Sequence, residues 1–287
     1  MKYQFIAAHQ QEYPVKTMCR VLEVAVSGFY AWLRRLGAPS RRSQENTGLG
    51  ERIARIYQAN RQVYGSPRIH AVLHAEGQAC GRKRVARLMR ERGLSAKPRR
   101  HRTRTTDSQH EQPVAPNLLN REFTATAPNT KWVADITAIW TMEGWLYLAV
   151  VLDIFSRMVV GWAMDAHRDE VLVDQAARMA LARRHPEPGL LHHSDRGSQY
   201  TAADYRELLA QSGIVVSMSG KGDCYDNALM ESFFGTLKSE CVDRQSFQSR
   251  AQARQAIFEY LEAFYHRQRL HSSLGYVSPV TYEQQVK

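Results

Sequence analysis

The fold is decided by KWVADITAIW (131–140), GWLYLAVVLDIFS (144–156) and RMVVGWAM (157–164). Each stretch is short, apolar and rich in β-branched or aromatic residues, and turn residues separate them, so they predict a meander of three strands. Downstream, the sequence predicts a helix, a strand, a helix, a strand and a long helix, at about 169–184, 190–194, 201–213, 214–218 and from about Asp226. The order βββαβαβα predicts an α/β fold whose mixed sheet is covered by helices on both faces.

This order of elements is that of the ribonuclease H-like fold. In this order the first and fourth strands are neighbours at the centre of the sheet, and the last helix packs over them. We therefore expect residues 128–287 to form one mixed-sheet core with a C-terminal helical extension.

The front half of the chain predicts short helices separated by turns, with apolar residues at helical spacing. Residues 15–35 predict a helix, a turn near Ser27 and Gly28, and a second helix. Residues 50–95 predict three more helices, with Pro67 in the first turn of the second and Gly93 at the end of the third. We divide this half into a helix-turn-helix-like segment, a basic helix-turn-helix domain and a basic, polar linker, at residues 1–48, 49–96 and 97–127.

The helix at 81–93 has one apolar side and one basic side. Val85, Leu88 and Met89 recur at helical spacing and can face a small core. The basic residues that we predict to bind DNA lie on the other side of this helix or follow it: Arg82, Lys83, Arg84, Arg87, Arg90, Arg99 and Arg100. A cationic helix of this kind fits a groove or a row of phosphates, although a solvated surface helix has the same pattern.

Charge is divided unevenly between the two halves of the chain. The whole chain has 39 Lys and Arg against 28 Asp and Glu, a net charge of +11. Residues 1–130 hold a net +14 and residues 131–287 a net −3. Basic residues concentrated in one half are typical of a protein that binds a polyanion, so we expect a nucleic acid as partner.

The four cysteines are far apart in the sequence, and no CxxC pair occurs. This spacing argues against a disulfide framework and against a zinc site. No apolar stretch is long enough to span a membrane, and the first residues do not resemble a signal peptide. We expect a cytoplasmic, nucleoid-associated bacterial protein.

Three acidic residues stand where the predicted fold makes them unusual. Asp135 lies inside the first apolar strand, where an unpaired carboxylate is costly. Asp195 directly follows the fourth strand, at the end where α/β sheets place their sites. Glu231 lies among apolar residues of the long helix. In the predicted order the three can converge, and we predict that they are the catalytic and metal-binding residues.

An all-oxygen set of ligands selects hard cations, Mg²⁺ or Mn²⁺. Two such ions about 3.5–4 Å apart can clamp a phosphodiester for in-line displacement. Each acid alone has another explanation, as a turn former or an ordinary helix residue, and their joint position favours the metal site. Asp153, Asp223 and Asp226 are competing acids, which we assign to a strand end, a loop and a helix start.

The acids are separated by 59 and 35 residues, a spacing that resembles the DD(35)E signature of retroviral integrases and insertion-sequence transposases. The words KWVADIT, GWLYLAVVLDIFSR, HSDRGSQY, SMSGKGDCYDNALMESFFGTLKSE and YHRQRLHSSLGYVSP resemble the second-reading-frame product of the two-frame, frameshifting transposase family. The words YPVKTMCRVLEVAVSGFYAWLRR and YGSPRIHAVL extend the resemblance to the front half.

This resemblance implies an integrase catalytic core that uses Mg²⁺, cuts at terminal inverted repeats and joins the freed 3′-hydroxyl to other DNA. It also implies a basic residue seven positions after the glutamate, here Lys238, that holds a DNA phosphate. The implied partners are terminal-repeat and target DNA, further copies of the chain, and the upstream-frame product, fused or separate. Two alternatives stay open: a ribonuclease H-like nuclease that does not join, and a non-catalytic DNA-binding protein derived from a transposase.

Overall fold

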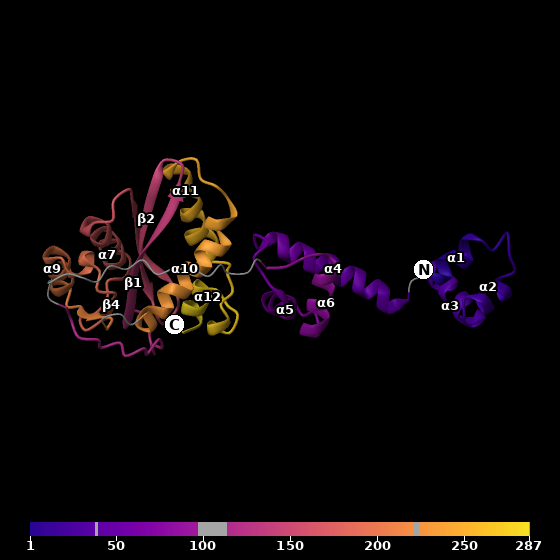
Figure 1. Ribbon diagram of the computed structural model, residues 1–287. Coiled ribbons are helices and arrows are strands. Elements are labelled where there is room, and N and C mark those ends of the chain that lie inside the picture. Colours follow the sequence, from indigo (N-terminus) through magenta and orange to yellow (C-terminus); the bar gives the residue numbers. More distant parts are fainter. Residues whose placement is uncertain (38–39, 97–113, 221–223, 287) are drawn as a thin grey trace.

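The computed structural model describes residues 1–37, 40–96, 114–220 and 224–286. Along the chain these residues form two groups of helices and then an α/β core (Figure 1). No helix in these ranges has the length and hydropathy needed to cross a membrane.

The first group comprises α1 (Lys2–Ala8), α2 (Val15–Val21) and α3 (Val26–Gly37). The turn predicted near Ser27 and Gly28 is wrong, because both residues lie in the first turn of α3. Gly28 is instead a point of close approach, since a Cβ there would lie 2.5 Å from the hydroxyl of Tyr3 in α1. The glycine allows α1, which the sequence did not predict, to pack against α3.

The second group comprises α4 (Arg41–Ala59), α5 (Ser66–Ala75) and α6 (Arg82–Glu91). Pro67 lies in the first turn of α5, as predicted. Helix α4 begins earlier than expected, because the side chain of Ser40 caps its N-terminus by accepting a hydrogen bond from the backbone N–H of Ser43 at 3.3 Å. It therefore runs across the boundary predicted between residues 48 and 49.

The core contains a five-stranded sheet in the order β3-β2-β1-β4-β5. The strands are β1 (Lys131–Thr141), β2 (Gly144–Asp153), β3 (Val159–Asp165), β4 (Leu191–Ser194) and β5 (Val215–Met218). The first three strands are antiparallel, and β4 and β5 add in parallel to the free edge of β1. The predicted meander and the central pairing of the first and fourth strands are confirmed.

Helices cover both faces of this sheet (Figure 1). One face packs against α7 (Glu170–Arg184) and α9 (Ala203–Gln211), which follows the short α8 (Ser198–Thr201). The other face packs against α10 (Ala228–Glu240) and α11 (Arg250–Phe258). The remaining elements are 3₁₀ turns at Cys224–Asn227, Val242–Arg244 and Ser272–Leu274, a π-helical segment at Glu259–Tyr265, and α12 (Pro279–Val286).

Strand alternation decides which face each residue of β1 meets. Val133 and Ile139 pack in the cluster that contains α10, whereas Trp132 and Ala134 pack in the cluster that contains α7. Because side chains alternate along a strand, Asp135 shares the α10 face with Val133. A carboxylate on β1 and a carboxylate on α10 can therefore meet.

The second helical group packs directly on the C-terminal part of the core. Tyr64 is fully buried, donates its hydroxyl proton to the carbonyl of Gln268 at 3.0 Å and accepts the N–H of Leu270 at 2.9 Å. Arg244 donates to the carbonyl of Arg61. These contacts join residues about 200 positions apart in the chain, so this helical group and the core share one interface.

Candidate active site

Asp135 lies in the middle of β1, opposite Val150 of β2. Its carboxylate accepts a hydrogen bond from the backbone N–H of Ile136 at 2.7 Å and keeps partial contact with solvent. The pKa of Asp135 is raised to about 8, mainly by burial and in addition by the negative charges of Asp195 and Glu231. A carboxyl with so high a pKa marks a place where negative charge is crowded.

Asp195 reaches the same place because β1 and β4 are parallel neighbours. Val133 pairs with His193, so Asp135 and Asp195 each lie two residues beyond paired positions. Asp195 accepts the backbone N–H of Gly197 at 2.9 Å. A Cβ at position 197 would lie 3.0 Å from that same oxygen, so the glycine allows the loop to close around the carboxylate.

Glu231 lies in the first turn of α10, the helix that packs over β1. Its side chain is exposed, and it raises the pKa of Asp135 less than Asp195 does. Within the described ranges, no three His, Cys, Asp or Glu side chains lie close enough together to hold a metal ion. The structure thus brings Asp135 and Asp195 together and places Glu231 above them, outside a closed three-carboxylate cluster.

Two further side chains stand beside the carboxylates and were not predicted. Arg168, just before α7, lowers the pKa of Asp135 by its positive charge. Its Nε and the hydroxyl of Tyr200 are buried without a hydrogen-bond partner among the described residues. Burial raises the pKa of Tyr200, and the charges of Asp135 and Asp195 raise it further. The word HSDRGSQY contains Tyr200, whereas Arg168 lies in a loop with no distinctive sequence signal.

The competing acids have structural roles. Asp153, at the end of β2, is fully buried and accepts the backbone N–H groups of Asn129 at 2.7 Å and Phe155 at 2.8 Å. Asp226, in the turn before α10, accepts the side-chain amide of Asn117 at 2.8 Å and the charged Arg121 at 3.2 Å. Asp223 lies outside the described residues.

The two histidines of β4 belong to the core. His192 and His193 are buried, and burial lowers the pKa of each to about 4, so both are neutral at pH 7. His192 is hydrogen-bonded to the hydroxyl of Tyr205 at 3.1 Å, and His193 to the hydroxyl of Ser217 at 2.8 Å. These hydrogen bonds tie both rings to core side chains, so we do not count them among the candidate metal ligands. The candidate ligands are therefore all oxygen atoms.

The predicted DNA-binding residues occupy two separate places. Lys238 is partly buried near the end of α10, seven residues after Glu231. On α6, Val85, Leu88 and Met89 are buried as predicted. The residues exposed on the other side are Arg82, Lys83, Arg87 and Arg90.

Arg84 differs from its α6 neighbours. It is partly buried against α4, where it donates to Asn46 at 2.8 Å and lies 3.7 Å from a carboxylate oxygen of Glu45. The outward position predicted for Arg84 is therefore only partly correct, because a polar face of α4 lies next to it. Arg99 and Arg100 lie outside the described residues.

The donor set fits a hard divalent cation. Asp135 within β1 and Asp195 just after β4 offer carboxylate oxygens on neighbouring strands, and the raised pKa of Asp135 indicates that a positive charge would be favourable there. Oxygen-only ligands favour Mg²⁺ or Mn²⁺ over Zn²⁺. Glu231 adds a third oxygen donor only if its exposed side chain turns toward the pair.

Comparison with known families identifies the class of this fold. Residues 125–224 match the integrase core domain, and residues 231–286 match a second model of the integrase core domain. Residues 43–102 match an HTH-like domain. The chain therefore contains an integrase core, which the family resemblance implied, preceded by the helix-turn-helix-like domain predicted from the front half of the sequence.

Similar proteins cover nearly the whole chain. The transposase InsF for insertion sequence IS3A of Escherichia coli (strain K12) is 44% identical over 283 residues, which cover 99% of this chain and 98% of that protein. An uncharacterized 31 kDa protein of insertion element IS600 from Shigella sonnei is 46% identical over 267 residues, 93% of this chain and 97% of that protein. The chain belongs to the IS3 family of insertion-sequence transposases.

Solved structures with a related fold come from retroviral integrases. The intasome of simian T-cell lymphotropic virus, in complex with PP2A regulatory subunit B56 gamma, matches with a TM-score of 0.47 and 15% identity, covering 80% of this chain and 74% of that chain. The HTLV-2 integrase catalytic core domain in complex with magnesium matches with a TM-score of 0.42 and 16% identity, covering 55% of this chain and 98% of that chain.

Proposed function

We propose that this transposase cuts and joins DNA at a site formed by Asp135, Asp195 and Glu231, which hold Mg²⁺ or Mn²⁺, two ions per site. The observation that carries the proposal is the crowding of negative charge on Asp135, whose pKa is raised by both other carboxylates. A cation-binding role accounts for this crowding.

The bound ions would activate an attacking oxygen and stabilise the leaving oxygen of a phosphodiester. Asp135 holds the site from within β1 and Asp195 from the end of the neighbouring β4, and the N–H of Gly197 fixes the direction of the Asp195 carboxylate. Glu231 completes the set when its exposed side chain turns toward the pair, because a cation removes the repulsion between the carboxylates. Arg168 limits the charge at the site when no cation is bound.

The substrate in this proposal is the DNA of the element's ends and of the target. The exposed basic face of α6 contacts phosphates of the terminal repeat, and Lys238 holds a phosphate near the cut. Joining two ends requires more than one copy of the chain, so we propose a homo-oligomer on DNA. The upstream-frame product, fused or separate, is the further partner.

Charge-removing substitutions that keep side-chain shape test this proposal. We expect Asp195→Asn and Glu231→Gln each to abolish cleavage and joining of a labelled terminal repeat in Mg²⁺, while DNA binding is retained. Asp204→Asn, an exposed acid in the first turn of α9, is the matched control and should react like wild type. A near-wild-type rate for either site variant would remove that residue from the set of ligands, and cleavage without joined product would favour a nuclease.

A further inference from the structure

A cavity of about 270 Å³ lies beside α10, and its lining residues do not include Asp135, Asp195 or Glu231. Its walls come from α5, the turn between β2 and β3, α10 and the segment that follows the π-helical residues. Two of the sequence words noted above, GWLYLAVVLDIFSR and YHRQRLHSSLGYVSP, each contribute to this lining, and the proposed reaction uses neither. The cavity is smaller than the roughly 300–1,000 Å³ of sites for whole small molecules, so it suits a small group.

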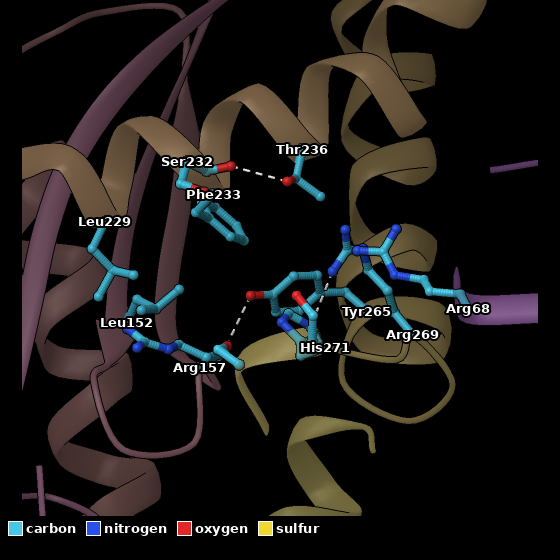
Figure 2. A pocket seen from close by; sticks show the side chains of 12 residues that line it. Arg68, Leu152, Arg157, Leu229, Ser232, Phe233, Thr236, Tyr265, Arg269 and His271 are labelled. Atoms are coloured by element: carbon cyan, nitrogen blue, oxygen red, sulfur yellow. Dashed lines mark hydrogen bonds between the residues drawn. The ribbon is translucent and has the colours of Figure 1, made fainter. Parts of the chain in front are cut away.

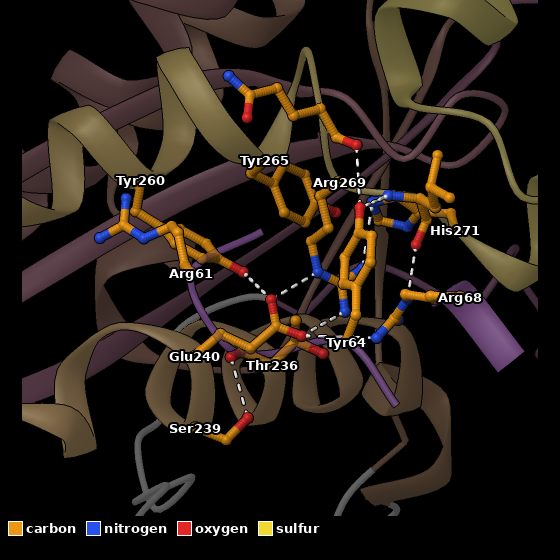
Figure 3. A network of polar contacts seen from close by, with 12 residues as sticks. Arg61, Tyr64, Arg68, Thr236, Ser239, Glu240, Tyr260, Tyr265, Arg269 and His271 are labelled. Atoms are coloured by element: carbon orange, nitrogen blue, oxygen red, sulfur yellow. Dashed lines mark hydrogen bonds and ion pairs between the residues drawn. The ribbon is translucent and has the colours of Figure 1, made fainter. Parts of the chain in front are cut away.

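Three arginines line the cavity. Figure 2 shows Arg68 and Arg269 on one side and Arg157 on the other, with Ser232 and Thr236 of α10 above them in this view. Arg269 is neutralised by Glu240, with two contacts of 2.7 Å, and Tyr260 donates to the same carboxylate at 2.8 Å (Figure 3). The Glu240 carboxylate therefore binds Arg269 and lies 3.8 Å from Arg68, whereas the carboxylate whose charge acts on Arg157 is that of Asp153.

The other two arginines retain binding capacity. Arg68 donates its Nε to the carbonyl of Leu270 at 2.8 Å, but its Nη1 is 3.8 Å from Glu240, beyond hydrogen-bond distance. Arg157 donates its Nη2 to the carbonyl of Phe123 at 3.1 Å. Its Nη1 is buried and has no hydrogen-bond partner in the described part of the chain. A buried, unsatisfied donor of a cation is costly, and an anion in the cavity would satisfy it once the Arg157 side chain turns toward the cavity.

The potential inside the cavity is positive. The pKa of His271 is lowered to about 2, mainly by burial and in addition by the charges of Arg269, Arg68 and Arg157. Its ring is therefore neutral at pH 7 and adds no charge of its own. Beside it, Ser272 and Ser273 present exposed side chains at the cavity wall. Guanidinium and hydroxyl groups are the kinds of donor from which phosphate oxygens accept hydrogen bonds.

We propose that this cavity binds a backbone phosphate of the DNA, using Arg157 and Arg68 with the hydroxyls of Ser272 and Ser273. The assignment to DNA, rather than to a free anion, rests on the proposed function. It is also supported by location, because Arg68 belongs to the helix-turn-helix-like domain and Ser232 is the residue next to Glu231. A phosphate held here ties the DNA to both domains at once.

The experiment scans a duplex of the element's own end with single neutral methylphosphonate linkages and measures affinity for wild type and Arg157→Gln. At one position, we expect the neutral linkage to lower the affinity of wild type about tenfold compared with the unmodified duplex. The same linkage should not lower the affinity of Arg157→Gln any further, and this non-additivity indicates a direct contact. The slope of log affinity against log salt should fall by about 0.9 in the variant, the value for one phosphate contact. Arg178→Gln, an exposed arginine of α7 paired with Asp174, is the matched control and should behave like wild type.

Arg157 also contacts Phe123, so its replacement could disturb folding, and a second variant avoids this. The double variant Ser272→Ala/Ser273→Ala changes two exposed side chains. It should reduce the loss of affinity caused by the neutral linkage at that same position and at no other position. Inorganic phosphate, titrated as a competitor, separates the two anion sources. If phosphate binds wild type and not Arg157→Gln, but no linkage position depends on Arg157, the site takes a free anion and the DNA assignment is overturned. Equal scans for all variants would overturn the site itself.

Cleavage in Mg²⁺ is measured in parallel. If wild type cleaves and joins DNA but its linkage scan equals that of Arg157→Gln, the proposed function is supported and the phosphate site is refuted. If one linkage position depends on Arg157 but wild type does not cleave DNA, the phosphate site is supported and the proposed function is refuted.

Discussion

Replacing Asp135 with Asn should make the metal-free protein more stable while it abolishes catalysis. Asp135 is held in a strand between apolar residues and beside Asp195 and Glu231, so the folded state disfavours its charged form. Asn keeps the shape and can still accept the N–H of Ile136. It has no proton to bind, and it does not repel the other two carboxylates.

The magnitude follows from the pKa of Asp135, which rises from 3.8 to about 8 on folding. At pH 7 the folded protein therefore holds a proton that the unfolded chain has released. The interval from 3.8 to pH 7 is roughly three pH units, and at about 1.4 kcal/mol per unit this lowers the free energy of unfolding by at most about 4 kcal/mol. The loss is absent below pH 3.8, grows as the pH rises toward 8, and is constant above it.

Urea unfolding in EDTA across pH 5–9 measures this effect. We expect Asp135→Asn to exceed wild type by an amount that grows from pH 5 to pH 8, whereas the control Asp204→Asn follows wild type. Added Mg²⁺ should raise the stability of wild type at pH 8 and leave Asp135→Asn unchanged. A variant that is less stable than wild type at pH 8, or that still responds to Mg²⁺, would refute the reasoning.

Three further outcomes follow from other contacts. Lys238→Ala should lower the joining rate about tenfold, a barrier increase of about 1.4 kcal/mol, with Lys238→Arg retaining much of the activity; equal wild-type rates for both at limiting DNA would contradict the phosphate role. Arg269→Gln should lower the free energy of unfolding by about 3–5 kcal/mol, because it leaves the buried charge of Glu240 without its partner; a loss below 1 kcal/mol by urea unfolding would contradict this. Gly161→Ala should destabilise the core by several kcal/mol, since its Cβ would lie 2.1 Å from the carbonyl oxygen of Ala176, and a thermal midpoint equal to wild type would show that α7 can shift away.

The strand order could be predicted because each strand is a separate apolar run bounded by turn residues. Parallel pairing of β1 with β4 then placed Asp135, within β1, beside Asp195, just after the end of β4, as the register shows. The spacing signature pointed to Glu231, yet its distance from the pair depends on the rotamer of an exposed side chain, which no pattern of residues encodes.

Other features depended on contacts between distant segments. Gly28 has the residue type of a turn, and only the position of Tyr3 reveals that it serves close packing. Arg84 follows the basic pattern of α6, but Asn46 of α4 lies beside it. Arg157 lies in a turn about 110 residues before His271, so the cavity that they share could not be predicted from either word alone.

The buried contact of Tyr64 with the segment around Leu270 has a consequence for the length of DNA between recognition and reaction. Because α4 to α6 are fixed to the core there, the distance from the basic face of α6 to the carboxylates is set by the protein, not by a flexible tether. If the proposed function is correct, this fixed distance sets the number of base pairs between the sequence bound by α6 and the position of cleavage. Inserting half a helical turn of about 5 base pairs between them would rotate the scissile bond to the far side of the duplex.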